Sequence, residues 1–228
     1  MHKGRSPLPV INEVEVRGVV VGVFFRENCY IVSSPKTKEA IVIDPGDEPE
    51  TVLELARDMG VSIKLIANTH GHTDHILGIR GIQERTSARF LIHPSEIPIL
   101  QRGTQQVTSR LGRSEEEPPE PEGFVSDGDT VSVAGLDLRV IHTPGHTPGS
   151  VSYYVNGLLF SGDTLFRGSV GRTDGPGSHQ QIMASITNKL LALPDDTIAL
   201  PGHELETTIR NERLSNPFIL QALQQAGK

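Results

Sequence analysis

The chain has 228 residues and a net charge of −7, so its length suits one sizeable domain or two small ones. An acidic chain without tryptophan has neither the basic surface nor the stacking platforms of a nucleic-acid-binding protein, and its single cysteine excludes an internal disulfide and a thiolate metal site. No run of 18 apolar residues and no apolar N-terminal signal region occurs, so we expect a cytoplasmic protein without a membrane partner.

Strand patterns surround one helix pattern in the first third of the chain. Asp47 and Glu50 have the spacing of a capping box and Gly60 can end a helix, so a helix is predicted over 48–59. The strands are short apolar runs bounded by turn residues. They are predicted over 14–23, 28–32, 39–43 and 61–68.

Residues 69–75, Thr-His-Gly-His-Thr-Asp-His, follow the last of these strands directly. His70 and His72 are two positions apart, so both imidazoles can point to the same side of an extended or turning backbone. Asp74 and His75 follow where an apolar helical pattern begins, and a helix N-terminus favours a carboxylate. Because four good metal ligands gather here in a chain with only 9 histidines, the segment predicts a metal site.

The helix that starts at Asp74 is predicted to reach about residue 85, and Ser95 is expected to cap a second, short helix. Residues 102–126 then form the most biased segment of the chain, rich in glutamate and proline. This composition predicts a mobile acidic loop inside one domain that spans 1–228. Two interpretations stay open, a lid over a site and a tolerated surface insertion.

Two hairpins and a helix are predicted in the second half. The hairpins turn at Ala134-Gly135 and Asn156-Gly157, of which the second is a preferred pair for a type I′ turn. Ser178 and Gln181 repeat the spacing of a capping box. A last strand is predicted over 197–200 and is followed by Pro-Gly-His.

Three further ligand candidates, His146, Asp163 and His203, each stand at the end of a predicted strand. Glycine or proline flanks each of them and lets the backbone bend close to a site. His142 also stands at a strand end, and we interpret it as structural. The second half therefore again ends its strands at ligand-type residues, as the first half does at residues 69–75.

The order H-x-H-x-D-H, Gly-His, Gly-Asp and Gly-His resembles the metallo-β-lactamase superfamily, over about residues 17–217. Within it the chain resembles the glyoxalase II-like branch, and Asp44 fits the early aspartate of the superfamily. The resemblance implies an α/β fold, a four-layer αβ/βα sandwich, with metals at one edge between two sheets. It is carried by residues 69–75, 162–166, 171–174 and 201–204.

The resemblance also implies a ligand set for two divalent metal ions. One ion is assigned to His70, His72 and His146, the other to Asp74, His75 and His203, and Asp163 is assigned as the bridge between them. Two roles stay open for each of two further residues. Arg172 would bind a substrate carboxylate or pair with a nearby aspartate, and Asp44 would orient a ligand histidine from behind or only form a turn, of which the orienting role is favoured. Since all donors are nitrogen or oxygen, zinc is expected, with iron or manganese as open choices.

The implied reaction is hydrolysis of a thioester, such as a hydroxyacylglutathione, or of a related ester. Two cations would turn a shared water into a hydroxide near neutral pH. Asp74 would act as a ligand, or as a general base if the second ion were absent. The chain ends 25 residues after His203, so the C-terminal helical region of full glyoxalase II enzymes, which helps to bind glutathione, has no clear counterpart.

Other functions fit the same motifs. A persulfide dioxygenase on this fold would hold one iron with residues matching His70, His146 and Asp163, and lactone hydrolysis and non-enzymatic metal binding are further alternatives. The runs over 162–166 and 211–218 favour the hydrolase. Thr208, Glu212 and Asn216 match the C-terminal pattern of short glyoxalase II-like proteins, and we expect them to anchor helices.

Overall fold

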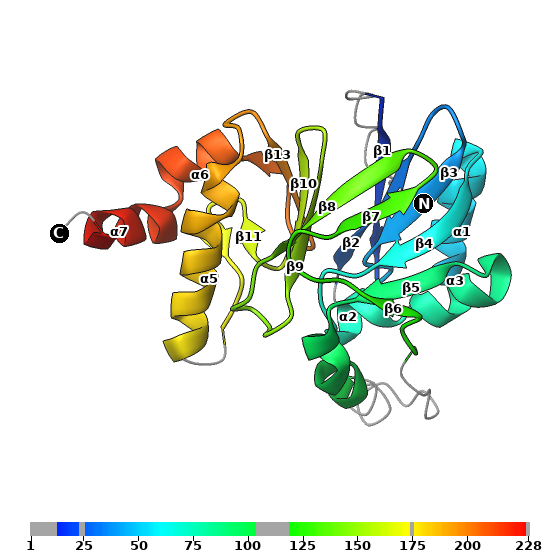
Figure 1. Ribbon diagram of the computed structural model, residues 1–228, viewed down its shortest axis with the longest axis horizontal. Coiled ribbons are helices and arrows are strands. Elements are labelled where there is room, and N and C mark those ends of the chain that lie inside the picture. The colour runs from blue at the N-terminus through cyan, green and yellow to red at the C-terminus, as the bar shows by residue number, and fades with distance from the viewer. Residues whose placement is uncertain (1–12, 23–25, 104–118, 174–175, 227–228) are drawn as a thin grey trace.

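The computed structural model describes residues 13–22, 26–103, 119–173 and 176–226, and it is built on two six-stranded sheets that face each other (Figure 1). The first sheet has the order β1-β2-β3-β4-β5-β6 and consists of β1 (Glu15–Val21), β2 (Glu27–Ser33), β3 (Glu39–Ile43), β4 (Ser62–Ala67), β5 (Arg89–Ile92) and β6 (Gly123–Phe124). The second has the order β14-β13-β10-β9-β8-β7 and consists of β7 (Thr130–Val133), β8 (Leu136–His142), β9 (Val151–Val155), β10 (Leu158–Gly162), β13 (Ile198–Pro201) and β14 (Thr207–Thr208). A two-stranded ribbon is formed by β11 (Leu165–Phe166) and β12 (Ser169–Val170).

Helices cover the outer face of each sheet (Figure 1). The first sheet is covered by α1 (Pro49–Met59) and α3 (Ile79–Thr86), with α2 (Thr73–Ile76), η1 (Pro94–Glu96) and a helix over 97–103 at its edge. The second is covered by α5 (Pro176–Asn188), with η2 (Leu190–Ala192), α6 (Ile209–Ser215) and α7 (Pro217–Ala226) after it. This arrangement confirms the predicted four-layer αβ/βα sandwich. In the described ranges no helix combines the length and the apolar character that a membrane crossing requires.

Three apolar clusters fill the spaces between the layers. In β2, Tyr30 and Val32 belong to the cluster between the sheets, whereas Cys29 and Ile31 belong to the cluster beneath α1 and α3. Successive side chains of a strand point to opposite faces, and both faces of this sheet are covered, so the whole strand is buried. A third cluster packs α5 against the second sheet. Cys29 is therefore buried in apolar surroundings, as a structural thiol would be.

Both predicted hairpins form with the predicted turn residues. Asn156 and Gly157 have φ angles of 48° and 85°, and Ala134 and Gly135 have φ angles of 46° and 83°. A type I′ turn needs positive φ at both central residues, which Asn and Gly adopt at low cost. The turns pair β7 with β8 and β9 with β10.

The predicted continuous helix after the histidine cluster is wrong, because the chain breaks it at residues 77–78. The backbone N–H of Leu77 donates to the carbonyl of Gly46 and that of Gly78 to the carbonyl of Pro45. These bonds tie the segment to the loop after β3 instead of continuing α2 into α3. A Cβ on Gly78 would lie 2.7 Å from the Pro45 carbonyl oxygen, so this close approach requires glycine.

The predicted helix caps are also wrong in detail. Glu48 is the N-cap of α1 with a φ of 48° and no side-chain cap, and Asp47 accepts from the Glu48 N–H instead of capping the helix. His93, not Ser95, caps η1 through its Nδ1. The helix α5 begins at Pro176, two residues before Ser178. Local residue pairs indicated where helices occur, but tertiary contacts decided which residue starts them.

The predicted loop over 102–126 is only partly described. Residues 104–118 lie outside the described residues, and with them most of the acidic run and the lid interpretation. Its far end is ordered, since β6 pairs in parallel with β5 through Leu91 and Gly123. The interpretation of 119–126 as loop without structure is therefore wrong at β6.

Thr208, Glu212 and Asn216, which were expected to anchor helices, all form hydrogen bonds at the ends of α6 and α7 or to their neighbours. Thr208 accepts from the N–H of Asn211 at the start of α6, and Asn216 accepts from the N–H of Phe218 at the start of α7. The Glu212 carboxylate is buried and accepts hydrogen bonds from Thr207 Oγ1, Gly168 N and Asn216 Nδ2. These bonds hold the last two helices onto the second sheet.

Candidate metal centre

Histidine and aspartate side chains from both sheets converge at one edge of the sandwich. From the first sheet, β4 leads into the loop of His70 and His72 and into α2, which carries Asp74 and His75. The second sheet contributes the other three residues, each from a loop that follows a strand. They are His146 after β8, Asp163 after β10 and His203 after β13. All seven residues that sequence analysis assigned to metals lie in this one place.

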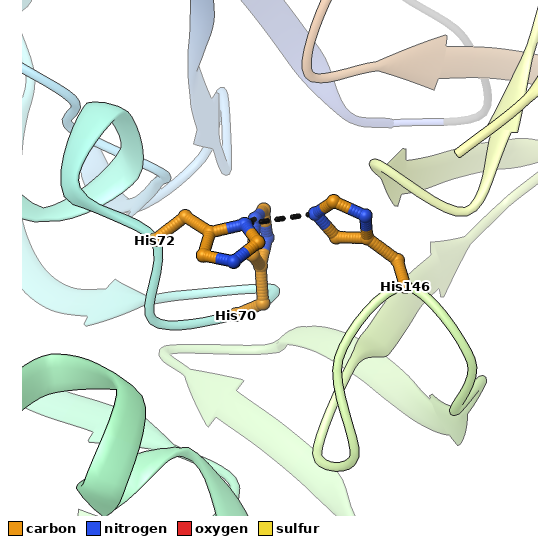
Figure 2. A group of neighbouring side chains, drawn as sticks. All are labelled: His70, His72 and His146. Carbon is orange, nitrogen blue, oxygen red and sulfur yellow. Dashed lines mark hydrogen bonds between the residues drawn. The ribbon is translucent and has the colours of Figure 1, made fainter. Parts of the chain in front are cut away.

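Three imidazoles meet at the first group of donors (Figure 2). His70 and His72 extend from one loop, and His146 points toward them from the loop between β8 and β9. His70 Nε2 lies 3.1 Å from His72 Nδ1, which in turn lies 2.9 Å from His146 Nε2. Three ring nitrogens that face one point form a trigonal face of the kind that Zn²⁺ and similar ions bind.

Asp74, His75 and His203 form a second group beside the first. His203 Nε2 lies 3.3 Å from Asp74 Oδ2. The His75 ring is fully buried, and the rings of His70 and His75 are 4.1 Å apart between centroids. The two groups are thus adjacent, and both draw residues from both sheets.

Asp163 lies between the two groups. One carboxylate oxygen is 3.5 Å from His75 Nε2, and the other is 3.6 Å from His146 Nε2 and 3.7 Å from His203 Nε2. Oδ1 therefore faces the second group, and Oδ2 lies near one histidine of each group, so this carboxylate reaches both groups as one shared by two cations must.

Backbone carbonyls determine which ring nitrogen faces the centre. The Nδ1–H of His146 donates to the carbonyl of Arg172 over 2.8 Å, and that of His203 donates to the carbonyl of Arg26 over 2.9 Å. A proton held at Nδ1 leaves the lone pair of Nε2 free to bind a metal. The structure thus gives Arg172 a backbone contact with a ligand, while its side chain is exposed.

Asp44 lies behind the centre and in contact with it. Its carboxylate accepts from the N–H and the hydroxyl of Thr69 and lies 3.2 Å from His75 Nδ1. Its φ of 49° is strained for a residue other than glycine, and such strain persists only where the surroundings enforce it. This position is the one from which a carboxylate can orient the His75 ring.

Electrostatics keep the first group neutral. Burial and the neighbouring His146 lower the pKa of His72 to about 4, and burial with the nearby rings lowers the pKa of His70 well below its usual value. Burial opposes charge on His75 and Asp74 as well, but Asp163 and Asp44 raise the pKa of His75, and a hydrogen bond from His203 lowers the pKa of Asp74. The imidazoles of His70 and His72 are thus in the neutral state that a cation requires, whereas His75, whose pKa is raised, would have to release a proton when an ion binds.

Unpaired buried atoms indicate that the site suits a metal. His75 Nε2 and Asp163 Oδ1 are buried and have no hydrogen-bond partner among the described residues. An unpaired buried polar group costs about 1–3 kcal/mol, more when it is charged. A cation between these atoms would remove that cost, so the nitrogen and oxygen donors fit divalent metal ions.

Glu27, the first residue of β2, also lies beside the centre and was not among the predicted site residues. Its side chain is 0% exposed, and Oε1 lies 3.7 Å from His75 Nδ1. Burial raises the pKa of Glu27 well above its usual value. A glutamate directly before the apolar run Cys29–Val32 was the available signal, because ionisable side chains are rarely buried without a reason.

Gly202, next to the ligand His203, leaves room for the centre. A Cβ there would lie 2.5 Å from Asp163 Oδ1 and 2.7 Å from His75 Cε1. We expect Gly202→Ala to weaken metal binding at least about tenfold, as changes beside metal ligands do. Metal content after dialysis against a chelator measures this.

Gly60→Ala is the control for that variant. A Cβ on Gly60 meets nothing within 4 Å, but its φ of 65° makes alanine strained there. It should cost about 1–2 kcal/mol of stability and leave metal content unchanged. Equal metal content in both variants and the wild type would show that Gly202 does not shape the site.

The two sheets and the donors at their ends define a class, αβ/βα proteins of the metallo-hydrolase type. The model of the Metallo-beta-lactamase superfamily matches residues 22–203. The chain belongs to the Metallo-beta-lactamase superfamily.

Relatives span nearly the whole chain. Hydroxyacylglutathione hydrolase GloC of Haemophilus influenzae is 32% identical over 199 residues, 86% of this chain and 93% of that protein. The probable metallo-hydrolase YqgX of Bacillus subtilis is 35% identical, over 85% of this chain and 92% of its own length. Hydroxyacylglutathione hydrolase of Aeromonas hydrophila is 35% identical over 84% of this chain, but the match covers only 66% of that protein.

Solved structures share the fold. BLEG-1, a B3 metallo-beta-lactamase, has a TM-score of 0.81 at 33% identity, covering 90% of this chain and 99% of that one. TTHA1623 in a di-iron-bound form has a TM-score of 0.76 at 35% identity, and the match covers 88% of this chain and 98% of that one. ETHE1 from Myxococcus xanthus has a TM-score of 0.70 at 26% identity, and the match covers 90% of this chain and 92% of that one.

Proposed function

We propose that this protein is a dinuclear metal-dependent hydrolase that cleaves a thioester of the hydroxyacylglutathione type or a related ester. The observation that carries the proposal is the pair of adjacent donor groups with Asp163 between them. His70, His72 and His146 would hold one ion, and Asp74, His75 and His203 the other. Asp163 would contact both.

Bound at these residues, two divalent ions supply a hydroxide nucleophile near neutral pH and a Lewis acid for the substrate carbonyl. The chain contributes the placement of the donors. Asp44 and the carbonyls of Arg172 and Arg26 hold the Nδ1 side of three ligand rings, so that the opposite nitrogens face the centre. We assign Asp74 as a ligand that acts as general base when its own group holds no ion.

The substrate class rests on similarity to relatives and on charge. GloC and the Aeromonas enzyme are named for hydroxyacylglutathione, and GloC matches this chain over 93% of its own length. The exposed side chain of Arg172 follows the ribbon β11–β12, and its backbone contacts the ligand His146. We assign its guanidinium to a substrate carboxylate, which it can bind as a bidentate fork.

Zinc is the ion we propose first, and iron and manganese suit the same donors. A set of imidazoles and carboxylates without thiolate accepts all three. The similar structure of TTHA1623 is a di-iron form, which supports iron as a second choice. A metal analysis of the protein as purified, together with turnover after reloading each ion, would rank them.

A persulfide dioxygenase is the second candidate, because the residues that the resemblance assigns to its iron lie together at the first group. It would need one iron, at His70, His146 and Asp163, and oxygen as co-substrate. The presence of a second group around Asp74, His75 and His203 favours the hydrolase.

Parallel assays on protein of known metal content test the proposal. We expect about two ions per chain, as in two-metal sites. In a panel of thioesters, S-lactoylglutathione or another member should be hydrolysed, and the reaction should not require oxygen. A set of lactones tests the remaining ester alternative. One iron per chain with oxygen uptake on glutathione persulfide, and no thioester turnover, would replace the hydrolase with the dioxygenase.

A further inference from the structure

Glu96 lies beneath the metal centre and is not one of its donors. The chain leaves β5, turns through η1 and places this glutamate under the loops that carry His70, His72 and His146. Its side chain is 0% exposed. A fully buried glutamate is costly unless its oxygens are paired, so its partners indicate its role.

The two carboxylate oxygens of Glu96 bind one loop each. Oε2 accepts from the backbone N–H of Gly71 over 2.8 Å, and Oε1 accepts from the backbone N–H of Gly149 over 2.7 Å. Gly71 stands between the ligands His70 and His72. Gly149 stands three residues after the ligand His146. One side chain thus joins the loop of the first sheet to the loop of the second.

Both loops approach Glu96 at a glycine. A Cβ on Gly149 would lie 2.7 Å from Glu96 Oε1, and a Cβ on Gly71 would lie 3.3 Å from Glu96 Oε2 and 3.2 Å from the Glu96 carbonyl oxygen. Gly149 therefore could not carry a side chain without displacing the carboxylate, and Gly71 would be crowded. The contact is a close, two-sided fit between one carboxylate and two backbones.

The joined loops carry one donor group and not the other. His70, His72 and His146 come from the two loops that Glu96 holds (Figure 2), whereas Asp74, His75 and His203 come from α2 and from the end of β13. The spacing of the first three ring nitrogens across the sheet interface depends on how closely these loops approach. Charged hydrogen bonds to two backbone N–H groups are strong enough to set that approach.

We propose that Glu96 is a positioning residue that holds the loops of His70, His72 and His146 at the separation needed to bind one metal ion. This inference rests on the proposed metal centre, but it concerns metal affinity and does not depend on which substrate is cleaved.

Glu96→Gln is the decisive variant. An amide of the same shape keeps one acceptor oxygen but presents NH₂ to the other N–H, so one of the two loops loses its bond. We expect the affinity of the His70–His72–His146 group for Zn²⁺ to fall about 10- to 100-fold, the range for partners of metal ligands. Competition with a chelator measures affinity on the metal-loaded protein, and histidine ring ¹⁵N resonances show which group has lost its ion.

Glu212→Gln is the matched control. Glu212 is also buried and also accepts from a glycine N–H, that of Gly168, but it anchors the C-terminal helices. Glu212→Gln should lower the melting temperature about as much as Glu96→Gln does. It should leave the affinities of both donor groups for Zn²⁺ unchanged. Glu96→Asp keeps two acceptor oxygens on a shorter stem, and its metal affinity should lie between those of the wild type and Glu96→Gln.

Two results would overturn the proposal. One is wild-type affinity at the His70–His72–His146 group in Glu96→Gln. The other is an equal loss at the Asp74–His75–His203 group, which would indicate a general loss of structure. A wild-type protein that binds metal but hydrolyses no thioester would contradict the proposed function and leave this inference standing.

Hydrogen exchange on the unmodified, metal-loaded protein provides a test that needs no variant. The amides of Gly71 and Gly149 should both exchange slowly, because each donates to a buried carboxylate. Fast exchange of either amide would show that Glu96 does not hold both loops, even if Glu96→Gln failed to fold.

Discussion

Asp163→Ala is expected to lower kcat/KM for a thioester substrate at least about 1,000-fold, the scale of losing a central catalytic group. Its carboxylate lies 3.5 Å from His75 Nε2 and 3.6 Å from His146 Nε2, between the two donor groups. Without it, five imidazoles would surround two cations with only Asp74 left to balance their charge. Metal analysis should show the loss of at least one ion, and circular dichroism should show an intact fold.

Asp127→Ala is the control for this loss. Asp127 forms an exposed ion pair with Lys189 over 2.8 Å and contacts none of the seven donors. Its replacement should leave metal content and turnover unchanged. Turnover by Asp163→Ala within about tenfold of wild type would remove Asp163 from the central position that we assign to it.

Removal of the metals is expected to lower the melting temperature by roughly 8–16 °C. A ligand present at about 1,000 times its Kd stabilises the folded state by about 4 kcal/mol, and each kcal/mol shifts the melting temperature of a chain of this size by roughly 2–4 °C. The reason is that the donors are already assembled in the fold, whereas the unfolded chain scatters them over more than half its length. Calorimetry before and after treatment with a chelator, and again after zinc is restored, measures the shift.

His142→Ala tests whether the shift arises at the proposed site. His142 stacks on His93 with ring centroids 4.5 Å apart and contacts none of the seven donors. The variant should keep the full metal-dependent shift, whereas His72→Ala should lose most of it. A wild-type shift in His72→Ala would mean that metal binds elsewhere.

The residues around the centre show which features could be predicted from local sequence. His70, His72 and Asp74 were found because ligand-type side chains rarely cluster by chance, and His146 and His203 because each follows a predicted strand beside glycine. Local pattern was also sufficient for the hairpin at Asn156-Gly157, whose φ angles follow from the turn type.

Other features depended on contacts between distant segments and escaped prediction. The break between α2 and α3 results from hydrogen bonds of residues 77–78 to the loop after β3, which no helical pattern reveals. Glu27 and Glu96 were overlooked because a glutamate in a sequence suggests solvent. Only the folded structure places Glu27 beside His75 and Glu96 between the loops of Gly71 and Gly149.

The sequence by itself determined the types of donors, their positions after strands and the alternation of strands and helices. These are local properties, since they follow from side-chain chemistry and from hydrophobic periodicity over a few residues. Only the tertiary structure decided which nitrogen of each ring faces the centre, how far apart the two donor groups lie and which buried carboxylates support them. Those quantities depend on how two sheets pack face to face, and packing joins residues more than 100 positions apart, such as Asn28 and Gly202.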